Sequence, residues 1–219
     1  MKDFNKKFGF TLSEVLITLG IIGIVAVLTI PAVMKNYRNR LYVAQLQKTY
    51  AQISDAVQAI MVDEHTGNFY ETKASLENNC TNADSGDCTA GAGYFLNKYF
   101  KVVKRNCASG TNACAAASYK SIGGANAGIL DGDYCIQTTN GAAICMKRNT
   151  ENNKVFIDLH IDVNGQADPN ITGRDVFYLT VQENGTVTDY RNTDESNCSN
   201  PNSSGCFNKV RNAGWKMEY

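Results

Sequence analysis

The order of apolar and polar positions divides the chain into an apolar N-terminal segment and a polar remainder. Residues 15–33 carry no formal charge and are mostly Ile, Val, Leu, Ala and Gly. As a helix, this run would be about 28 Å long at ~1.5 Å per residue. The hydrocarbon core of a membrane is about 30 Å thick, so the run predicts a membrane-spanning helix.

Apolar side chains continue beyond this run at three- and four-residue steps, from Tyr42 to Met61. Charged and amide side chains such as Lys48 and Gln52 take the opposite face, which is the pattern of an amphipathic helix. We expect this helix to end near Glu64. Its apolar stripe is expected to pack on the chain's own sheet, and the alternative is a docking face for another protein.

Past residue 66 the pattern predicts a loop, a short helix and then strands. Helical spacing covers residues 91–105, and alternation begins near residue 130. The predicted elements are a hairpin at 134–146 around Asn140-Gly141, a half-buried strand at 155–163, and a hairpin at 176–190 around Asn184-Gly185. The expected fold class is therefore α+β, a long N-terminal helix packed on an antiparallel β-sheet head.

The charge and the motifs of the chain argue against two classes of function, nucleic-acid binding and catalysis. The chain has 21 Lys+Arg, 21 Asp+Glu and 2 His, and this zero net charge argues against a nucleic-acid partner. Lys98, Lys101, Lys104 and Arg105 lie among aromatic residues, and we interpret them as a solvated helix face rather than a nucleic-acid patch. The chain has no G-x-S-x-G, H-E-x-x-H or phosphate-binding glycine loop, so we expect no enzyme.

All eight cysteines lie at or beyond position 80, as near neighbours. The candidate pairs are Cys80 and Cys88, Cys107 and Cys114, Cys135 and Cys145, and Cys198 and Cys206. Eight cysteines allow 105 connectivities, so spacing alone does not decide the pairing. The even count and the lack of C-x-x-C favour disulfides over metal ligands.

The predicted hairpin makes one pairing specific. Cys135 and Cys145 face each other if the loop is the three residues 139–141 with Gly141 left-handed. A two-residue loop would instead place Cys135 opposite Met146. We expect the other near neighbours to pair in the same way.

Oxygen-bearing side chains gather after the predicted strand at 155–163. Asp162, Asn164 and Asp168 are candidate calcium ligands, because Ca²⁺ prefers hard oxygen ligands. The segment lacks the bidentate Glu and the full spacing of an EF-hand. An Asn-Gly turn followed by an Asp-Pro turn explains the same residues, and we favour that interpretation. We expect no other cofactor.

A positively charged leader precedes the apolar run. Its three lysines, Lys2, Lys6 and Lys7, outnumber Asp3. Positive charge beside an apolar span is held on the cytoplasmic side, so the head is expected outside the cytoplasm. The small residue Gly9 precedes the apolar core, and cleavage there would leave that core attached. An uncleaved signal anchor is the alternative.

Two features of the apolar helix, Glu14 and Pro31, suggest more than an anchor. Glu14 borders the uncharged run, where an acid is costly and marks a candidate functional site. The alternative is local, because Thr11 to Glu14 fits a capping box. Pro31 removes one backbone hydrogen bond and predicts a kink, and with Gly23 it bounds a weak stretch that could unwind during assembly.

The segment Gly9-Phe10-Thr11-Leu12-Ser13-Glu14-Val15 resembles the processing site of type IV prepilins and of type II secretion pseudopilins. The resemblance covers roughly residues 1–60 and is weak in the head. It implies that a membrane peptidase cleaves the Gly9–Phe10 bond and that Phe10 is N-methylated. It also assigns the family's glutamate to Glu14 and its helix-breaking proline to Pro31.

The resemblance implies a leader at 1–9, a membrane and assembly helix at 10–64, and an extracytoplasmic pilin-like head with disulfide-stapled loops at 65–219. The expected function is a structural subunit of a type II secretion pseudopilus or a type IV pilus. The implied partners are other pilin subunits, the prepilin peptidase and methylase, the bacterial inner membrane and the assembly platform. Because major pseudopilins bind calcium in a C-terminal loop, the resemblance also adds weight to the calcium interpretation.

A rival interpretation comes from another functional class. The chain would then be a membrane-anchored extracytoplasmic enzyme or binding domain that never assembles. This rival predicts no cleavage at Gly9 and no dependence on Glu14, which makes the two hypotheses separable.

Overall fold

The computed structural model describes residues 9–108, 112–199 and 204–219. The expected leader, except for Gly9, lies outside the described residues. The chain forms two compact units, residues 1–39 and residues 40–219, and the helix α1 (Leu12–Asp63) runs through both. These bounds lie close to the predicted helix at 10–64. The helix continues without a break through Pro31.

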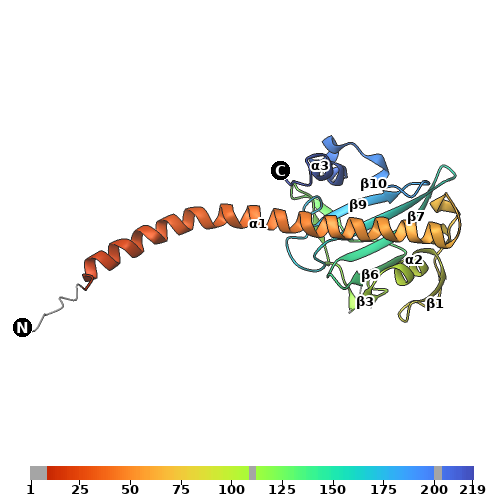
Figure 1. Cartoon of the computed structure of the whole chain (residues 1–219), viewed down its shortest axis with the longest axis horizontal. Coiled ribbons are helices and arrows are strands. Elements are labelled where there is room, and N and C mark those ends of the chain that lie inside the picture. The colour runs from red at the N-terminus through yellow and green to blue at the C-terminus, as the bar shows by residue number, and fades with distance from the viewer. Residues whose placement is uncertain (1–8, 109–111, 200–203) are drawn as a thin grey trace, which may run out of the picture. The chain divides into compact units, whose positions relative to one another are not determined.

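The second unit, residues 40–219, comprises the C-terminal part of α1 and the head, which is built around a six-stranded antiparallel sheet (Figure 1). Its strand order is β10-β9-β8-β7-β6-β3, and two short two-stranded sheets, β1-β2 and β4-β5, accompany it. The strands are β1 (Asn79–Asn82), β2 (Asp87–Ala90), β3 (Val102–Arg105), β4 (Tyr119–Lys120), β5 (Asn126–Gly128), β6 (Tyr134–Thr138), β7 (Ala143–Glu151), β8 (Lys154–Asp162), β9 (Val176–Val181) and β10 (Val187–Asp189). The helices after α1 are η1 (Phe69–Glu71), η2 (Lys73–Ser75), α2 (Gly91–Tyr99), η4 (Tyr190–Asn192), η5 (Glu195–Ser199) and α3 (Cys206–Asn212).

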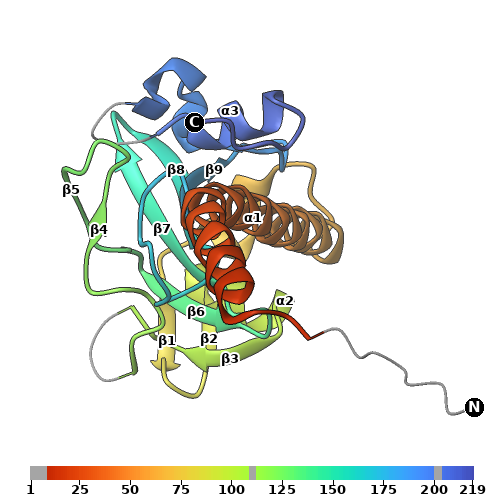
Figure 2. The ribbon, with the colours of Figure 1, turned by 90° about the vertical axis from the view of Figure 1, so that its left-hand side faces the viewer.

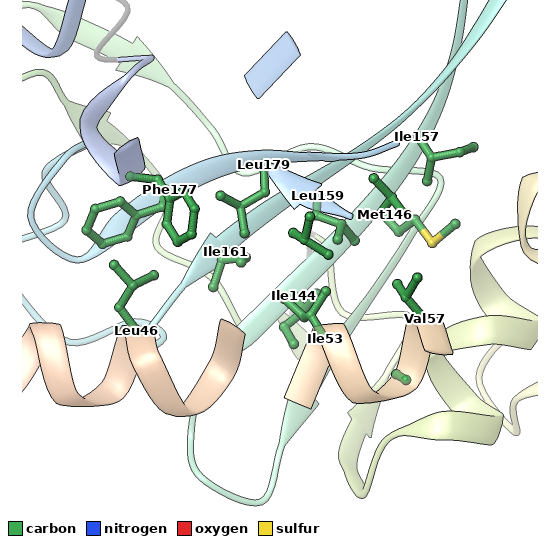
Figure 3. Packing of buried hydrophobic residues seen from close by; sticks show 14 of the residues in the cluster. Leu46, Ile53, Val57, Ile144, Met146, Ile157, Leu159, Ile161, Phe177 and Leu179 are labelled. Carbon is green, nitrogen blue, oxygen red and sulfur yellow. The ribbon is translucent and has the colours of Figure 1, made fainter. Parts of the chain in front are cut away.

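The C-terminal part of α1 packs on the inner face of this sheet (Figure 3). Leu46, Ile53 and Val57 of α1 are fully buried, and they belong to one cluster with Ile144 of β7 and Leu159 of β8. Burying each such side chain contributes about 1.5–3 kcal/mol to folding. The amphipathic stripe therefore packs on the chain's own sheet, as predicted.

The outer face of the sheet carries a second, smaller cluster, which the segment containing β4 and β5 covers. Tyr119 and Leu130 from this segment pack with Cys145 and Val176 of the sheet. Figure 2 shows β4 and β5 on the side of the sheet away from α1. One end of the sheet is thus covered on both faces.

This double coverage corrects the prediction of a half-buried strand at 155–163. Asp158 and Asp162, which alternate with the apolar residues of β8, are both 0% exposed. Tyr119 covers Asp162, and the guanidinium of Arg191 approaches Asp158 to 3.4 Å. The alternation of apolar and polar residues predicted correctly which side chains of β8 lie on the inner face. It carries no information about segments that cover the outer face.

The predicted helix at 91–105 is also too long. The helix α2 ends at Tyr99, and Phe100 has extended backbone angles. Val102 and its neighbours form β3, which pairs with β6. β-Branched residues such as Val102 and Val103 favour a pleated strand, so helical spacing placed them in the wrong element.

Candidate processing and assembly site

The N-terminus of α1 is closed by a reciprocal hydrogen-bonded cap. The backbone N and the Oγ1 of Thr11 each donate to Oε2 of Glu14, both at 2.8 Å. The backbone N of Glu14 donates in return to Oγ1 of Thr11 at 3.3 Å. This is a capping box, which satisfies backbone N–H groups that have no partner within the helix.

A single oxygen of Glu14 takes both bonds from Thr11. Among the described residues, no donor is bonded to the second carboxylate oxygen, Oε1, and the residue is exposed. The capping box therefore occupies half of the carboxylate. The other half has no partner within residues 9–108, 112–199 and 204–219, so it can accept a donor from beyond them.

The Gly9–Phe10 bond lies in accessible, non-helical backbone just before the cap. A Cβ atom built on Gly9 would meet nothing within 4 Å, and the side chain of Phe10 is 89% exposed. The helix begins at Leu12. A protease could therefore reach this bond without unfolding α1.

Downstream of the cap, α1 exposes a continuous apolar surface. Among the described residues, α1 is the one helix that is long and apolar enough to cross a membrane, and none of its most apolar window is buried. The hydroxyls of Thr18 and Thr29 donate to the carbonyls of Val15 and Val25, at 3.0 and 2.9 Å. These polar groups are satisfied inside the helix, as a hydrocarbon environment requires.

The predicted weak stretch of this helix is helical at both ends. Gly23 has open space around its Cα, and Pro31 lies within the continuous helix. Unwinding between these two residues during assembly stays a prediction.

The structure joins the four neighbouring cysteine pairs as disulfides, 80–88, 107–114, 135–145 and 198–206. Cys135 lies directly opposite Cys145 in the β6–β7 register. The backbone N of Thr138 donates to the carbonyl of Ala142, which leaves a three-residue loop, and Gly141 has φ of 90°. The predicted hairpin geometry and the predicted pairing are confirmed.

The calcium candidates form a hydrogen-bonded turn at the end of β8. Asp162 accepts the hydroxyl of Tyr119 and the backbone N of Asn164. The side-chain amide of Asn164 donates to the carbonyls of Ala167 and Asp168. The interpretation as turns accounts for these contacts. Within the part of the chain that is described, no group of three His, Cys, Asp or Glu side chains could hold a metal ion.

The basic residues around α2 are engaged by neighbours within the head. The ammonium of Lys98 lies 3.2 Å from the carboxylate of Asp63 and 3.1 Å from the hydroxyl of Tyr94. Arg105 Nε donates to Asn97 at 3.0 Å. Lys98 is exposed on α2, as the predicted solvated helix face requires, whereas Lys101 lies beyond this helix and Lys104 and Arg105 belong to β3.

Residues 4–30 match the family model of the prokaryotic N-terminal methylation motif. This motif is the prepilin-type signal of type IV pilins and pseudopilins, so residues 4–30 of the chain are similar to that signal. It implies processing by prepilin peptidase and assembly with other pilin-type subunits. With the apolar helix, it indicates a single-pass, membrane-anchored protein. No curated protein and no solved structure matches the chain.

Proposed function

We propose that the chain is a structural subunit of a type II secretion pseudopilus or a type IV pilus, cleaved between Gly9 and Phe10 and assembled through α1. One observation carries the proposal. The accessible Gly9–Phe10 bond, the half-occupied carboxylate of Glu14 and the exposed apolar helix follow one another within one linear segment. No catalytic activity is part of the proposal.

Cleavage creates a positive amine at Phe10, four residues before Glu14. Charges in or near the apolar layer are costly when they are unpaired. The free oxygen of Glu14 offers a partner to the amine of a neighbouring subunit, while the bonded oxygen keeps the helix capped. Pairing of this kind lowers the cost of both charges and sets the axial register of the two subunits.

The head is assigned to the extracytoplasmic side of the inner membrane. The positive leader favours the cytoplasmic side, and four disulfides suit an oxidising compartment. The leader then meets the prepilin peptidase and methylase at the membrane, and the mature helix meets the assembly platform. The rival function remains a membrane-anchored extracytoplasmic enzyme or binding domain that does not assemble.

The intact mass of the membrane-extracted protein tests the proposal. We expect the wild-type chain to lack residues 1–9 and to carry a methylated Phe10. Gly9→Val should stay full-length, because a side chain at this position obstructs the peptidase. Gly67→Val is the matched control, since Gly67 also has open space around it but lies in the head. Full-length wild-type protein, or a mature mass from Gly9→Val, would favour the rival.

A further inference from the structure

The head contains an open cavity of about 800 Å³ where β8 and β9 separate, beside the β7–β8 and β9–β10 turns. The two strands pair from Asp162↔Val176 to Ile157↔Val181 and no further. Beyond that point the backbone N of Phe69 donates a hydrogen bond to the carbonyl of Glu183, at 2.7 Å. The hydroxyl of Tyr70 donates to the carbonyl of Val181 at 2.9 Å. These bonds hold the β9–β10 turn away from β8.

Among the described residues, the separation leaves backbone groups of β8 without a partner strand. Asn152 and Asn153 both have positive φ and form a two-residue turn between Glu151 and Lys154, which pair directly. In such a hairpin the next pair makes no mutual hydrogen bonds, so the N–H and C=O of Val155 point away from β7. They face the side that β9 has left, where Val155 lines the cavity.

The lining combines aromatic rings with side-chain amides. Tyr70 and Phe156 contribute two half-buried rings, of which Phe156 has one face covered by the guanidinium of Arg191, 4.6 Å from the ring centre. Asn153, Gln182 and Asn184 contribute amides. Each amide both donates and accepts hydrogen bonds. Within the described residues, the side chain of Asn153 has no hydrogen bond, and only one end of each other amide is bonded.

The charge of the lining is balanced. Lys154 is its cation and Glu183 is its anion, and both side chains are exposed. Nucleic acids and other polyanions require a basic excess, which the lining lacks. Glycoside hydrolysis requires two carboxyl groups across the scissile bond, and Glu183 is the single carboxylate of the lining. The chemistry fits binding of a neutral ligand without cleavage.

We infer that this cavity binds a neutral oligosaccharide. A pyranose ring presents an apolar C–H face, which stacks on aromatic rings, and hydroxyls, which pair with amides and with the free backbone groups of Val155. The cavity volume lies within the range of about 300–1,000 Å³ that is typical of small-ligand sites. The site goes beyond filament assembly and does not depend on it.

Saturation-transfer NMR on the whole membrane-extracted protein tests the site, in a detergent without a sugar headgroup. The probes are cellohexaose and maltohexaose as glucans, chitohexaose as an N-acetylated cell-wall-type glycan, and heparin as a polyanion. We expect at least one neutral hexaose to bind and heparin to bind more weakly. Whether the glucans or chitohexaose bind more tightly distinguishes an external glycan from a cell-wall source.

Two variants locate the binding. Thr186→Trp fills the cavity from an exposed position and should weaken binding by about tenfold or more. Asn153→Gly keeps the positive φ, removes one amide and should weaken binding by about three- to tenfold. Thr89→Trp is the matched control, because Thr89 is exposed on β2 and does not line the cavity.

Circular dichroism and disulfide mapping would confirm that the variants fold like the wild type. The inference is overturned if no neutral hexaose binds, if heparin binds more tightly than every hexaose, or if folded Thr186→Trp binds like the wild type. Loss of binding in Thr89→Trp alone would also overturn it. None of these results bears on cleavage at Gly9, so the proposed function is tested separately.

Discussion

The hydroxyl of Tyr119 donates a 2.7 Å hydrogen bond to the carboxylate of Asp162, and both side chains are almost completely buried. Tyr119 lies in the segment that covers the outer face of the sheet, whereas Asp162 ends β8. The bond therefore ties the covering segment to the sheet. Burial, as the main cause, raises the pKa of Asp162 to about 7. Burial also raises the pKa of Tyr119, which keeps its hydroxyl protonated as a donor.

Asp162 should make the head less stable as the pH rises. Its folded pKa, about 7, lies above the unfolded value of about 3.9, so the folded state binds the proton more tightly. The stabilisation is complete below about pH 4 and is lost as the pH rises to about 7, by roughly 3–4 kcal/mol. Asp162→Asn should therefore show a flatter stability profile between pH 5 and pH 8 in denaturant unfolding. Asp55→Asn, at an exposed position of α1, should keep the wild-type slope. Parallel profiles for wild type and Asp162→Asn would contradict this assignment.

Asp189 should hold the C-terminal helix on the head. Its carboxylate is buried and accepts the backbone N–H groups of Tyr190, Gly205 and Asn208, at 2.7–2.8 Å. Asp189→Ala leaves these donors without an acceptor, and we expect a cost of about 3 kcal/mol or more. Limited proteolysis should then cut near α3 at a higher rate than in the wild type. Asp194→Ala is the control, because that carboxylate is exposed and caps a surface turn at Ser196. Equal cleavage rates in the two variants would exclude the anchoring role.

The four disulfides should differ in what they contribute beyond chain entropy. The loops closed by 80–88 and 135–145 are similar in length, and the chain-entropy estimate gives about 3 kcal/mol for each. Cys135 and Cys145 are fully buried in the outer cluster, whereas Cys80 and Cys88 are only partly buried. Replacing Cys135 and Cys145 by Ala should therefore cost more than the same change at Cys80 and Cys88, since it also leaves a cavity. Urea unfolding of the two double variants makes the comparison, and equal losses would show that packing adds nothing.

Elements that depend on local signals could be predicted from the sequence. The Asn-Gly turns at Asn140 and Asn184 identified two hairpins, and the spacing of Cys135 and Cys145 agreed with a three-residue loop. The N-terminal site was equally accessible to prediction, because a peptidase signal is a linear motif. Gly9 to Glu14 can be read without knowing the fold.

Elements that depend on distant partners could not be predicted. Tyr119 covers Asp162 from 43 residues away, and Asp189 anchors a helix that begins at Cys206. No local sequence pattern indicates either contact. The cavity has the same origin, because Tyr70 reaches it from a segment more than a hundred residues before the β9–β10 turn.

Glu14 has two candidate roles, and the structure shows how both can operate together. The capping role uses Oε2, which accepts both bonds from Thr11. The pairing role requires a negative charge and a free oxygen. Removing the hydroxyl of Thr11 would change the first role, and removing the charge of Glu14 would change the second.

Glu14→Gln keeps a side-chain acceptor for the capping box but removes the charge. If capping is its whole contribution, the variant should be processed, membrane-resident and assembled like the wild type. If its charge pairs with the amine of Phe10 on a neighbouring subunit, processing should be normal but the yield of sheared and pelleted filaments should fall by about tenfold or more. This follows because about 1.4 kcal/mol of lost pairing energy corresponds to a tenfold change.

Glu218→Gln, at an exposed acid near the C-terminus, controls for the loss of one negative charge. Thr11→Val should give the complementary result, a helix that is less well capped at its first turn but retains the charge, and hence a higher filament yield than Glu14→Gln. A normal yield from Glu14→Gln would rule out charge pairing as the basis of subunit register, because no other acid lies within the first turns of α1.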